Sequence, residues 1–333
     1  MEDSRQPETS RALALGLCAV AAVAALSPFL GGDALDWRRA LAGEWPDAEI
    51  LWNIRATRTL LALVSGGALA AAGVLFQALL RDPLATPYTL GVSSGASLGA
   101  VTAIFFGWES VWGLPAVWTA ALAGSGAALA LVVAIASGGR RLSSFTLLLA
   151  GVTLNSVAMA LILLLHSLAG FGKSFAIVHW LMGGLGPLSW PKLGAVAAVV
   201  AALALWIFSR SRAWNLLIAG EEWAASRGLD PGRLLLAGYI AGSVLTATIT
   251  AITGPVGFVG LIVPHALRLK LGADHRALLP ASLVYGAAFL GLCDIVSRVP
   301  VRPAEIPVGV ITALIGGPVF ILLLRSARRS LWL

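Results

Sequence analysis

Long apolar tracts alternate with short charged clusters along the chain. A helix that crosses the hydrocarbon core of a bilayer needs ~20 predominantly apolar residues. All the tracts but the eighth reach about that length, and the eighth is interrupted by glycine and proline. The pattern therefore predicts an all-α polytopic membrane protein of about ten transmembrane helices, with the region 171–188 irregular. The predicted helices cover residues 12–30, 59–79, 89–107, 115–137, 145–168, 190–209, 234–253, 256–267, 278–297 and 307–324.

The composition supports the membrane class. Of the 333 residues, 58% are hydrophobic and 12% are charged, whereas a soluble domain carries about 25% charged residues. The first tract could also be a cleaved signal peptide, because Arg5 and Arg11 precede an apolar run. The acidic, proline-containing leader MEDSRQPE and the length of the tract favour a retained helix. We therefore expect residues 1–333 to form a single transmembrane domain.

The eighth tract opens the most informative stretch of the sequence, GPVGFVGLIVPHALRLKLGADHRALLP, from Gly254 to Pro280. Helix breakers interrupt its apolar part, and a charged cluster follows. Broken apolar segments are tolerated at membrane depth only when they are buried in protein or line a cavity. The stretch therefore indicates a membrane protein that carries a pathway, with a charged surface just outside the bilayer.

The distribution of positive charge predicts the orientation of the chain. An even number of crossings puts both termini on one side, and cytoplasmic loops carry an excess of Lys and Arg. With the termini in the cytoplasm, the inner loops hold fifteen of the 23 Lys and Arg residues: Arg5, Arg11, Arg81, Arg140, Arg141, Arg210, Arg212, Arg227, Arg233, Arg268, Lys270, Arg276, Arg325, Arg328 and Arg329. The net charge of +7 is thus mainly a topology signal, and no nucleic-acid partner is implied.

A few arginines are predicted on the outer side. Arg55 and Arg58 come just before the second helix, and Arg298 and Arg302 come just after the ninth. Arginines at helix ends often extend to the membrane interface. They could instead form a basic rim that receives carboxylates of an extracytoplasmic partner. The sequence by itself favours neither interpretation.

Nothing in the sequence indicates an energy source within this chain. Ion-coupled transporters usually carry ionisable residues inside the membrane, but the tracts 59–79, 89–107 and 115–137 have none. The segment SLAGFGKS, Ser167–Ser174, lacks the first glycine of a phosphate-binding loop and does not follow a strand. Four scattered histidines and three methionines give no metal-ligand spacing. We therefore expect no catalytic, metal or nucleotide site.

The segment GVSSG, Gly91–Gly95, fits the G-x-S-x-G pattern of serine hydrolases. An intramembrane protease would need a histidine near Ser93, and only His166 lies near membrane depth. Glycine also recurs every four residues, through Gly99. Small residues at this spacing let helices pack closely, and this interpretation is the stronger one.

The inner loop Arg210–Arg233 contains a short amphipathic pattern. From Gly220 it predicts a helix with Glu221 and Glu222 in its first turn and Arg227 in its last, and Gly228 can supply the left-handed cap. Such a helix could rest on lipid. Its two acidic residues suit the docking of a cytoplasmic protein better than the binding of anionic lipid.

Several blocks of the sequence resemble the FecCD-type permeases, the membrane subunits of type II ABC importers for ferric siderophores, haem and cobalamin. One block is RATRTLLALVSGGALAAAGVLFQALLRDPLATPYTLGVSSGASLGA, Arg55–Ala100, and the Gly254–Pro280 stretch is a second. CDIVSR, Cys293–Arg298, and EIPVGVITALIGGPVFILLLR, Glu305–Arg325, form a third. The resemblance covers nearly the whole chain, apart from the first helix and the loop 31–54.

The resemblance implies the type II ABC importer permease fold and a homodimer in the bacterial inner membrane. Two copies of a separate cytoplasmic ABC ATPase, which holds the ATP and Mg²⁺, would bind on one side, and a periplasmic substrate-binding protein on the other. This subunit would then be neither an enzyme nor the holder of a cofactor. Arg55, Arg58 and Arg298 match arginines that pair with binding-protein glutamates. The family's ATPase-coupling helix matches residues 219–229, with Gly220, Glu221, Glu222, Ala225, Arg227 and Gly228. Ser143 and Ser144 fall near the inner gate.

The expected function is therefore ATP-driven import from the periplasm. A ferric siderophore is the favoured cargo because it is frequent in the family, and cobalamin and haem are the alternatives. Because the path lacks charge, weak and largely apolar contact with a bulky cargo is expected. An ion-coupled secondary transporter is a more distant alternative, and an intramembrane serine protease is the most distant.

Overall fold

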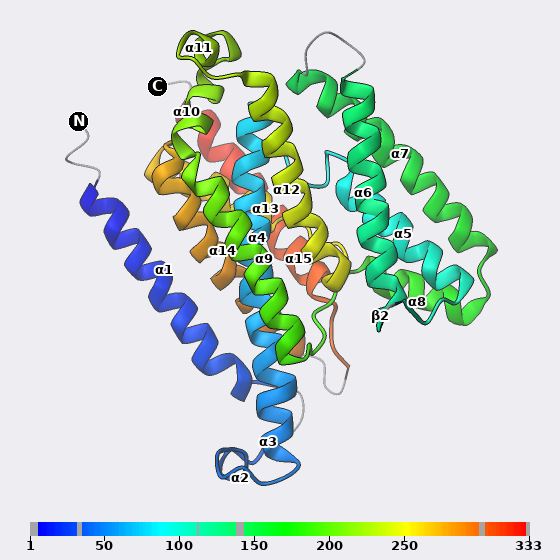
Figure 1. The fold of residues 1–333 in the computed structure, drawn as a ribbon. Coiled ribbons are helices and arrows are strands. Elements are labelled where there is room, and N and C mark those ends of the chain that lie inside the picture. Colours follow the sequence, from blue (N-terminus) through cyan, green and yellow to red (C-terminus); the bar gives the residue numbers. More distant parts are fainter. Residues whose placement is uncertain (1–5, 32–34, 112, 138–142, 300–303, 331–333) are drawn as a thin grey trace. The chain divides into compact units, whose positions relative to one another are not determined.

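A computed structural model describes residues 6–31, 35–111, 113–137, 143–299 and 304–330, with side chains from residue 9 to residue 323 (Figure 1). Arg5, Arg140, Arg141 and Arg302 of the predicted loops lie outside these residues. The elements are α1 (Gln6–Leu26), η1 (Ser27–Phe29), α2 (Trp37–Leu41), α3 (Asp47–Glu49), the π-helix η2 (Ile50–Ala56), α4 (Thr57–Leu80), α5 (Val92–Phe106), β1 (Ser110–Val111), β2 (Leu114–Pro115), α6 (Ala116–Ala136), α7 (Ser144–Leu168), α8 (Phe171–Leu181), α9 (Trp190–Ser209), α10 (Ser211–Ala219), α11 (Glu221–Ser226), α12 (Pro231–Thr253), α13 (Val259–Leu271), α14 (His275–Arg298) and α15 (Val308–Ser330).

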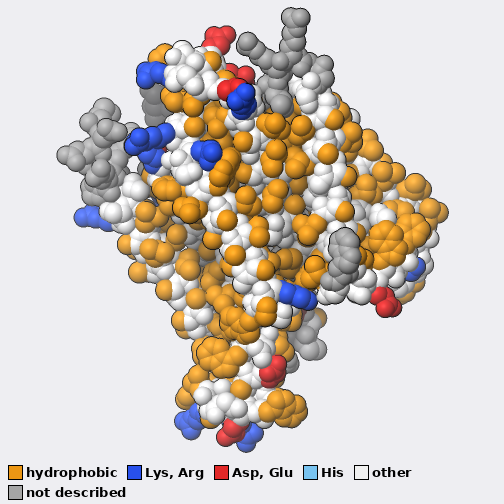
Figure 2. Space-filling model, in the orientation of Figure 1, with side chains coloured by type: hydrophobic (Ala, Val, Ile, Leu, Met, Phe, Trp, Pro, Cys, Tyr) orange, Lys and Arg blue, Asp and Glu red, His pale blue; other side chains and the backbone are white. Residues whose placement is uncertain are grey.

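Each of the ten predicted apolar tracts forms a helix, which confirms the all-α polytopic fold. Among the described residues, seven helices are long and apolar enough to cross a membrane, and α5 and the apolar part of α15 are shorter. The eighth tract is α13, which has only 13 residues and contains Pro264. Figure 2 shows hydrophobic side chains over most of the visible helices, while charged side chains are sparse and gather near α2–α3 and α10–α11.

Several short helices were not predicted from the sequence, and α8 and α10 are the longest of them. The region 171–188 is not irregular throughout, because residues 171–181 form α8. Ile177 of α8 is fully buried in a cluster with Val101 and Ile162. Packing against residues distant in the sequence therefore stabilises a helix that the local sequence pattern does not predict. The inner loop likewise contains α10, whose Trp214 is fully buried and donates from Nε1 to the carbonyl of Ile207 at 2.8 Å.

The chain divides into two compact units. Unit 1 comprises residues 1–71, 184–198 and 256–333, and unit 2 comprises 72–183 and 199–255. In unit 1, α4 and α14 approach so closely that a Cβ on Gly66 would lie 2.2 Å from the carbonyl oxygen of Gly286. α1 also packs on α14, and the hydroxyl of Tyr285 donates to the carbonyl of Ala12 at 3.0 Å.

In unit 2, α5 and α6 form a similarly close pair. A Cβ on Gly99 would lie 2.0 Å from the carbonyl oxygen of Ala120, and one on Gly95 would lie 2.6 Å from that of Gly124. Only glycine permits this contact, which confirms the helix-packing interpretation of the GVSSG segment. The histidine considered for a protease is engaged elsewhere: Nε2 of His166 is hydrogen-bonded to the hydroxyl of Ser174 at 2.8 Å.

The helical conformation is interrupted between α12 and α13, at the start of the Gly254–Pro280 stretch. Gly254, with φ +65°, ends α12, and Phe258, with φ +68°, precedes α13. A Cβ on Gly254 would lie 2.5 Å from the carbonyl oxygen of Trp180, so both the backbone angle and the available space require glycine there. The predicted interruption of the apolar run is therefore confirmed.

Candidate functional site

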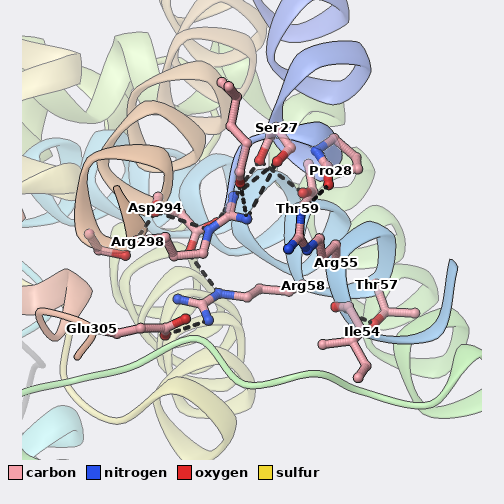
Figure 3. A network of polar contacts seen from close by, with 12 residues as sticks. Ser27, Pro28, Ile54, Arg55, Thr57, Arg58, Thr59, Asp294, Arg298 and Glu305 are labelled. Carbon is pink, nitrogen blue, oxygen red and sulfur yellow. Dashed lines mark hydrogen bonds and ion pairs between the residues drawn. The ribbon is translucent and has the colours of Figure 1, made fainter. Parts of the chain in front are cut away.

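Two of the predicted site residues, Arg58 and Arg298, meet around one buried carboxylate in unit 1. Asp294 of α14 is completely buried. Its Oδ1 accepts a hydrogen bond from Nε of Arg58 at 2.9 Å, and its Oδ2 lies 2.8 Å from Nη2 of Arg298. Arg58 also donates from Nη1 to Oε2 of Glu305 at 2.7 Å. In Figure 3 the Arg58 side chain lies between the carboxylates of Asp294 and Glu305. We call Ser27, Arg55, Arg58, Asp294, Arg298 and Glu305 the Asp294 cluster.

Local helical geometry builds this cluster. Asp294 and Arg298 are four residues apart on α14 and therefore lie on the same helix face. The guanidinium of Arg298 also donates to the carbonyl of Leu30 at 2.8 Å and to the hydroxyl of Ser27 at 2.6 Å, just beyond α1. Carbonyls at a helix end attract cations. Arg298 thus holds the end of α1 against α14.

Arg55 lies deeper than the sequence suggested. The π-helix η2 continues directly into α4, so Arg55 is part of a helical segment rather than of a preceding loop. Its side chain is buried, and its Nη1 donates to the carbonyl of Pro28 at 3.5 Å. A Cβ on Gly31 would lie 2.8 Å from the guanidinium carbon of Arg55, so the neighbouring backbone closes tightly over it.

Exposure distinguishes the members of the Asp294 cluster. The side chain of Arg298 is 3% exposed, that of Arg58 is 12% exposed and that of Glu305 is 49% exposed. Arg298 therefore does not extend to the membrane interface, and its guanidinium serves contacts within the chain. Arg58 and Glu305 form the accessible edge of the cluster. Partner docking by Arg55, Arg58 and Arg298 stays a prediction, and Arg58 is the best placed of the three for it.

A second group of predicted residues meets around Glu221 in unit 2. Oε1 of Glu221 accepts from Nη2 of Arg81 at 2.6 Å and from the hydroxyl of Ser144 at 3.5 Å. The same hydroxyl donates to the carbonyl of Leu79, at the end of α4, at 2.6 Å. We call Leu79, Arg81, Ser144 and Glu221 the Glu221 cluster. It ties the start of α11 to the end of α4 and the start of α7.

The helix α11 matches the expected coupling helix, with shorter bounds. It covers Glu221–Ser226, so Arg227 is its C-cap rather than part of its last turn. Glycines with positive φ stand on both sides, Gly220 at +136° and Gly228 at +82°, and the predicted left-handed conformation of Gly228 is confirmed. Ala224 is fully buried and anchors the helix. The exposed residues are Glu222, Trp223, Ala225, Ser226, Arg227 and Gly228.

The exposed face of α11 carries a large aromatic side chain. Trp223 is 52% exposed, and the guanidinium of Arg227 lies over its ring at 5.2 Å from the centroid. Tryptophan and arginine are the residue types that contribute most to protein interfaces. The arrangement therefore suits the binding of a protein outside the bilayer.

The predicted gate residues have structural contacts. Ser143 is the N-cap of α7, and its hydroxyl accepts from the backbone N–H of Thr146 at 3.2 Å. Ser144 is buried within the Glu221 cluster. Their role in a gate stays a prediction.

Sequence analysis missed the partners of these residues. Asp294 and Glu305 lie 236 and 247 positions from Arg58, and Glu221 lies 140 positions from Arg81. The only local signal was the four-residue spacing of Asp294 and Arg298. In the part of the chain that the structure describes, no group of three or more His, Cys, Asp or Glu side chains could hold a metal ion.

Apolar helices of membrane-spanning length define the class of multi-pass membrane proteins. The family follows from comparison with known proteins. Residues 17–326 match the FecCD transport family, and the chain belongs to this family.

Two relatives illustrate the range of the family. The chain is 41% identical over 287 residues to the ABC transporter permease protein YvrB of Bacillus subtilis, covering 84% of this chain and 80% of that protein. It is 39% identical over 290 residues to the vitamin B12 import system permease protein BtuC of Escherichia coli, covering 86% of this chain and 88% of BtuC.

The solved structures agree with this assignment. A chain from a structure described as an inward-facing conformation of a metal-chelate type ABC transporter has a TM-score of 0.84 and 32% identity, covering 95% of this chain and 99% of that one. PsaBC from Streptococcus pneumoniae shares the fold, with a TM-score of 0.52 and 17% identity over 86% of this chain and 95% of that one. The protein is thus an ABC importer permease of the FecCD and BtuC type, and ATPase and binding-protein partners are implied for this class.

Proposed function

We propose that this chain is the membrane-spanning half of an ATP-driven importer that takes up a bulky metal chelate. In this proposal two copies form the permease, two copies of an ABC ATPase bind at α11, and a substrate-binding protein docks at the Asp294 cluster. The observation that carries the proposal is the family match over 17–326, because it covers both clusters. ATP hydrolysis is assigned to the ATPase, where ATP and Mg²⁺ bind, and no bond is broken in this subunit.

The cargo has two candidates, each with its own support. A ferric siderophore is supported by the similarity to a metal-chelate type ABC transporter. Cobalamin is supported by the similarity to the vitamin B12 permease BtuC. Both are bulky chelates, which suits a path with few charged groups.

The proposed location is the bacterial inner membrane, with both termini in the cytoplasm. The excess of Lys and Arg in the loops assigned to the cytoplasm supports this orientation. It puts α11 on the ATPase side and the Asp294 cluster on the periplasmic side.

The Glu221 cluster suggests how movement of the ATPase reaches the permease. ATP binding that closes the ATPase dimer would displace α11. The Arg81–Glu221 ion pair at 2.6 Å and the Ser144–Leu79 hydrogen bond would carry this displacement to α4 and α7. Two alternating arrangements of these helices would then expose the path to one side at a time, and a cargo bound tightly in both would not move on.

Assembly provides a first test. The permease co-expressed with its ATPase subunit and purified in nanodiscs is expected to run as one complex, with two copies of each chain by native mass spectrometry. Replacing Trp223 with alanine should weaken the complex, because a half-exposed tryptophan is a typical interface anchor. Replacing Trp45, which is exposed but lies far from α11 in the sequence, should leave the complex intact. A permease that binds no ATPase would contradict the proposal.

A further inference from the structure

At the accessible edge of the Asp294 cluster, the guanidinium of Arg58 binds two carboxylates. Arg58 uses Nε for the buried Asp294 and Nη1 for Glu305. Asp294 is completely buried, whereas the Glu305 side chain is about half exposed. One hydrogen bond of Arg58 is therefore made to a buried carboxylate, and the other to a carboxylate partly open to solvent.

The two contacts also differ in how easily they can be exchanged. Separating Arg58 from Asp294 would take one of two guanidinium partners from a completely buried carboxylate, which is unfavourable. The Glu305 carboxylate is half exposed, so water and salt compete for it, and its contact with Arg58 is the more readily exchanged of the two. A carboxylate arriving from outside can thus replace Glu305 while Asp294 keeps Arg58 in position.

The backbone of this segment supports such an exchange. The N–H of Ile306, directly after Glu305, donates to the carbonyl of Ser297 in the last turn of α14 at 3.0 Å. Position 305 is therefore anchored to the helix that carries Asp294 and Arg298. Rotation about the side-chain bonds of Glu305 is sufficient to withdraw its carboxylate from Arg58, so the main chain need not move.

We propose that Glu305 is an internal substitute for the carboxylate of an acidic partner protein. In the undocked permease it occupies the outer edge of Arg58, and a partner must displace it to bind. Glu305 thereby weakens docking and favours release of the partner after each cycle. This inference rests on the proposed docking of an acidic binding protein at the Asp294 cluster. It adds a residue that opposes that docking.

The test is the affinity of the transporter's own substrate-binding protein for the permease–ATPase complex in nanodiscs, measured by biolayer interferometry. Glu305→Gln removes the competing charge and is expected to bind about 3-fold tighter, since exposed ion pairs are worth a fraction of a tenfold change. Glu305→Asp keeps the charge and shortens the side chain. Tighter binding by this variant would therefore reflect loss of the contact with Arg58 and not a change of net charge.

Two further variants complete the design. Glu44→Gln removes an exposed carboxylate that lies 3.8 Å from Arg39 and not at Arg58, so it is expected to leave the affinity unchanged. Arg58→Gln is expected to weaken docking and to abolish the gain from Glu305→Gln when the two are combined.

The outcomes distinguish this inference from the proposed function. Unchanged or weaker binding by Glu305→Gln, together with weaker binding by Arg58→Gln, would overturn the role of Glu305 and leave docking at the cluster standing. Equal gains from Glu305→Gln and Glu44→Gln would also overturn it, because they would reflect net charge. Unchanged binding by a folded Arg58→Gln variant would overturn docking at Arg58 and, with it, this inference.

Discussion

Replacement of Asp294 by asparagine is expected to cost about 3–5 kcal/mol of stability, the typical result of removing one partner of a buried ion pair. Asp294 is the carboxylate that lies against both Arg58 and Arg298, and it is completely buried. Its neutral isostere would keep the shape of the side chain, remove the carboxylate that faces Arg298, and leave Arg58 with the half-exposed carboxylate of Glu305. The permease should therefore lose most of its folded yield.

The measurement is the denaturation midpoint of the detergent-purified variant, followed by tryptophan fluorescence. Glu305→Gln is the matched control, because it removes the other carboxylate of the same arginine from a half-exposed position. The control should lose no more than about 1 kcal/mol. Removing Arg298 together with Asp294 should recover part of the loss, since fewer unpaired charges remain buried. An Asp294→Asn variant as stable as the unaltered protein would show that the carboxylate does not hold the cluster together.

Reversing the charge of Glu221 is expected to reduce transport at least about tenfold, a change that corresponds to ~1.4 kcal/mol in rate. Glu221→Arg would place a cation against Arg81, which now lies 2.6 Å from the carboxylate. Two like charges ~4 Å apart repel by about 4 kcal/mol at an effective dielectric constant of ~20. The start of α11 should therefore separate from the end of α4, so that ATP hydrolysis continues without uptake.

The comparison of uptake and ATPase rates in one preparation measures this uncoupling. Combining Glu221→Arg with Arg81→Glu should restore transport, because the ion pair is re-formed in reverse. Arg233→Glu is the control: it reverses an exposed charge in the first turn of α12, outside α11, that pairs with Asp230 at 3.2 Å. If the double reversal recovers no transport, the result would count against the Arg81–Glu221 contact as the connection between α11 and α4. Unchanged coupling of ATP hydrolysis to uptake in Glu221→Arg would refute this role of the contact.

The sequence predicted the helices well and their polar contacts poorly. All ten apolar tracts form helices, and seven of these have the length and composition that crossing a bilayer requires, which can be counted residue by residue. α8 and α10 were not predicted because they are short. Burial of Ile177 against Val101 and Ile162 stabilises α8, and the fully buried Trp214 anchors α10. The local pattern of apolar and polar residues does not reveal such packing.

The same limit applies to the arginines. At the sequence level, Arg298 could be an interfacial side chain or a docking residue, and the structure shows a buried guanidinium bound to Ser27, Leu30 and Asp294. Nothing near Arg58 in the sequence indicates that its partners come from α14 and from the segment before α15. By contrast, Gly228 was predicted correctly because the need for a left-handed residue after a short helix is a local property.

The central claim is that this chain transports a bulky chelate only when an ATPase drives it. The most direct test is uptake into proteoliposomes that contain the permease, with the substrate-binding protein and either labelled ferric siderophore or labelled cobalamin outside. The account predicts accumulation of one of these cargoes when the ATPase subunit and enclosed ATP are both present, and none when either is left out. Uptake that proceeds without the ATPase, or that follows an ion gradient, would contradict it.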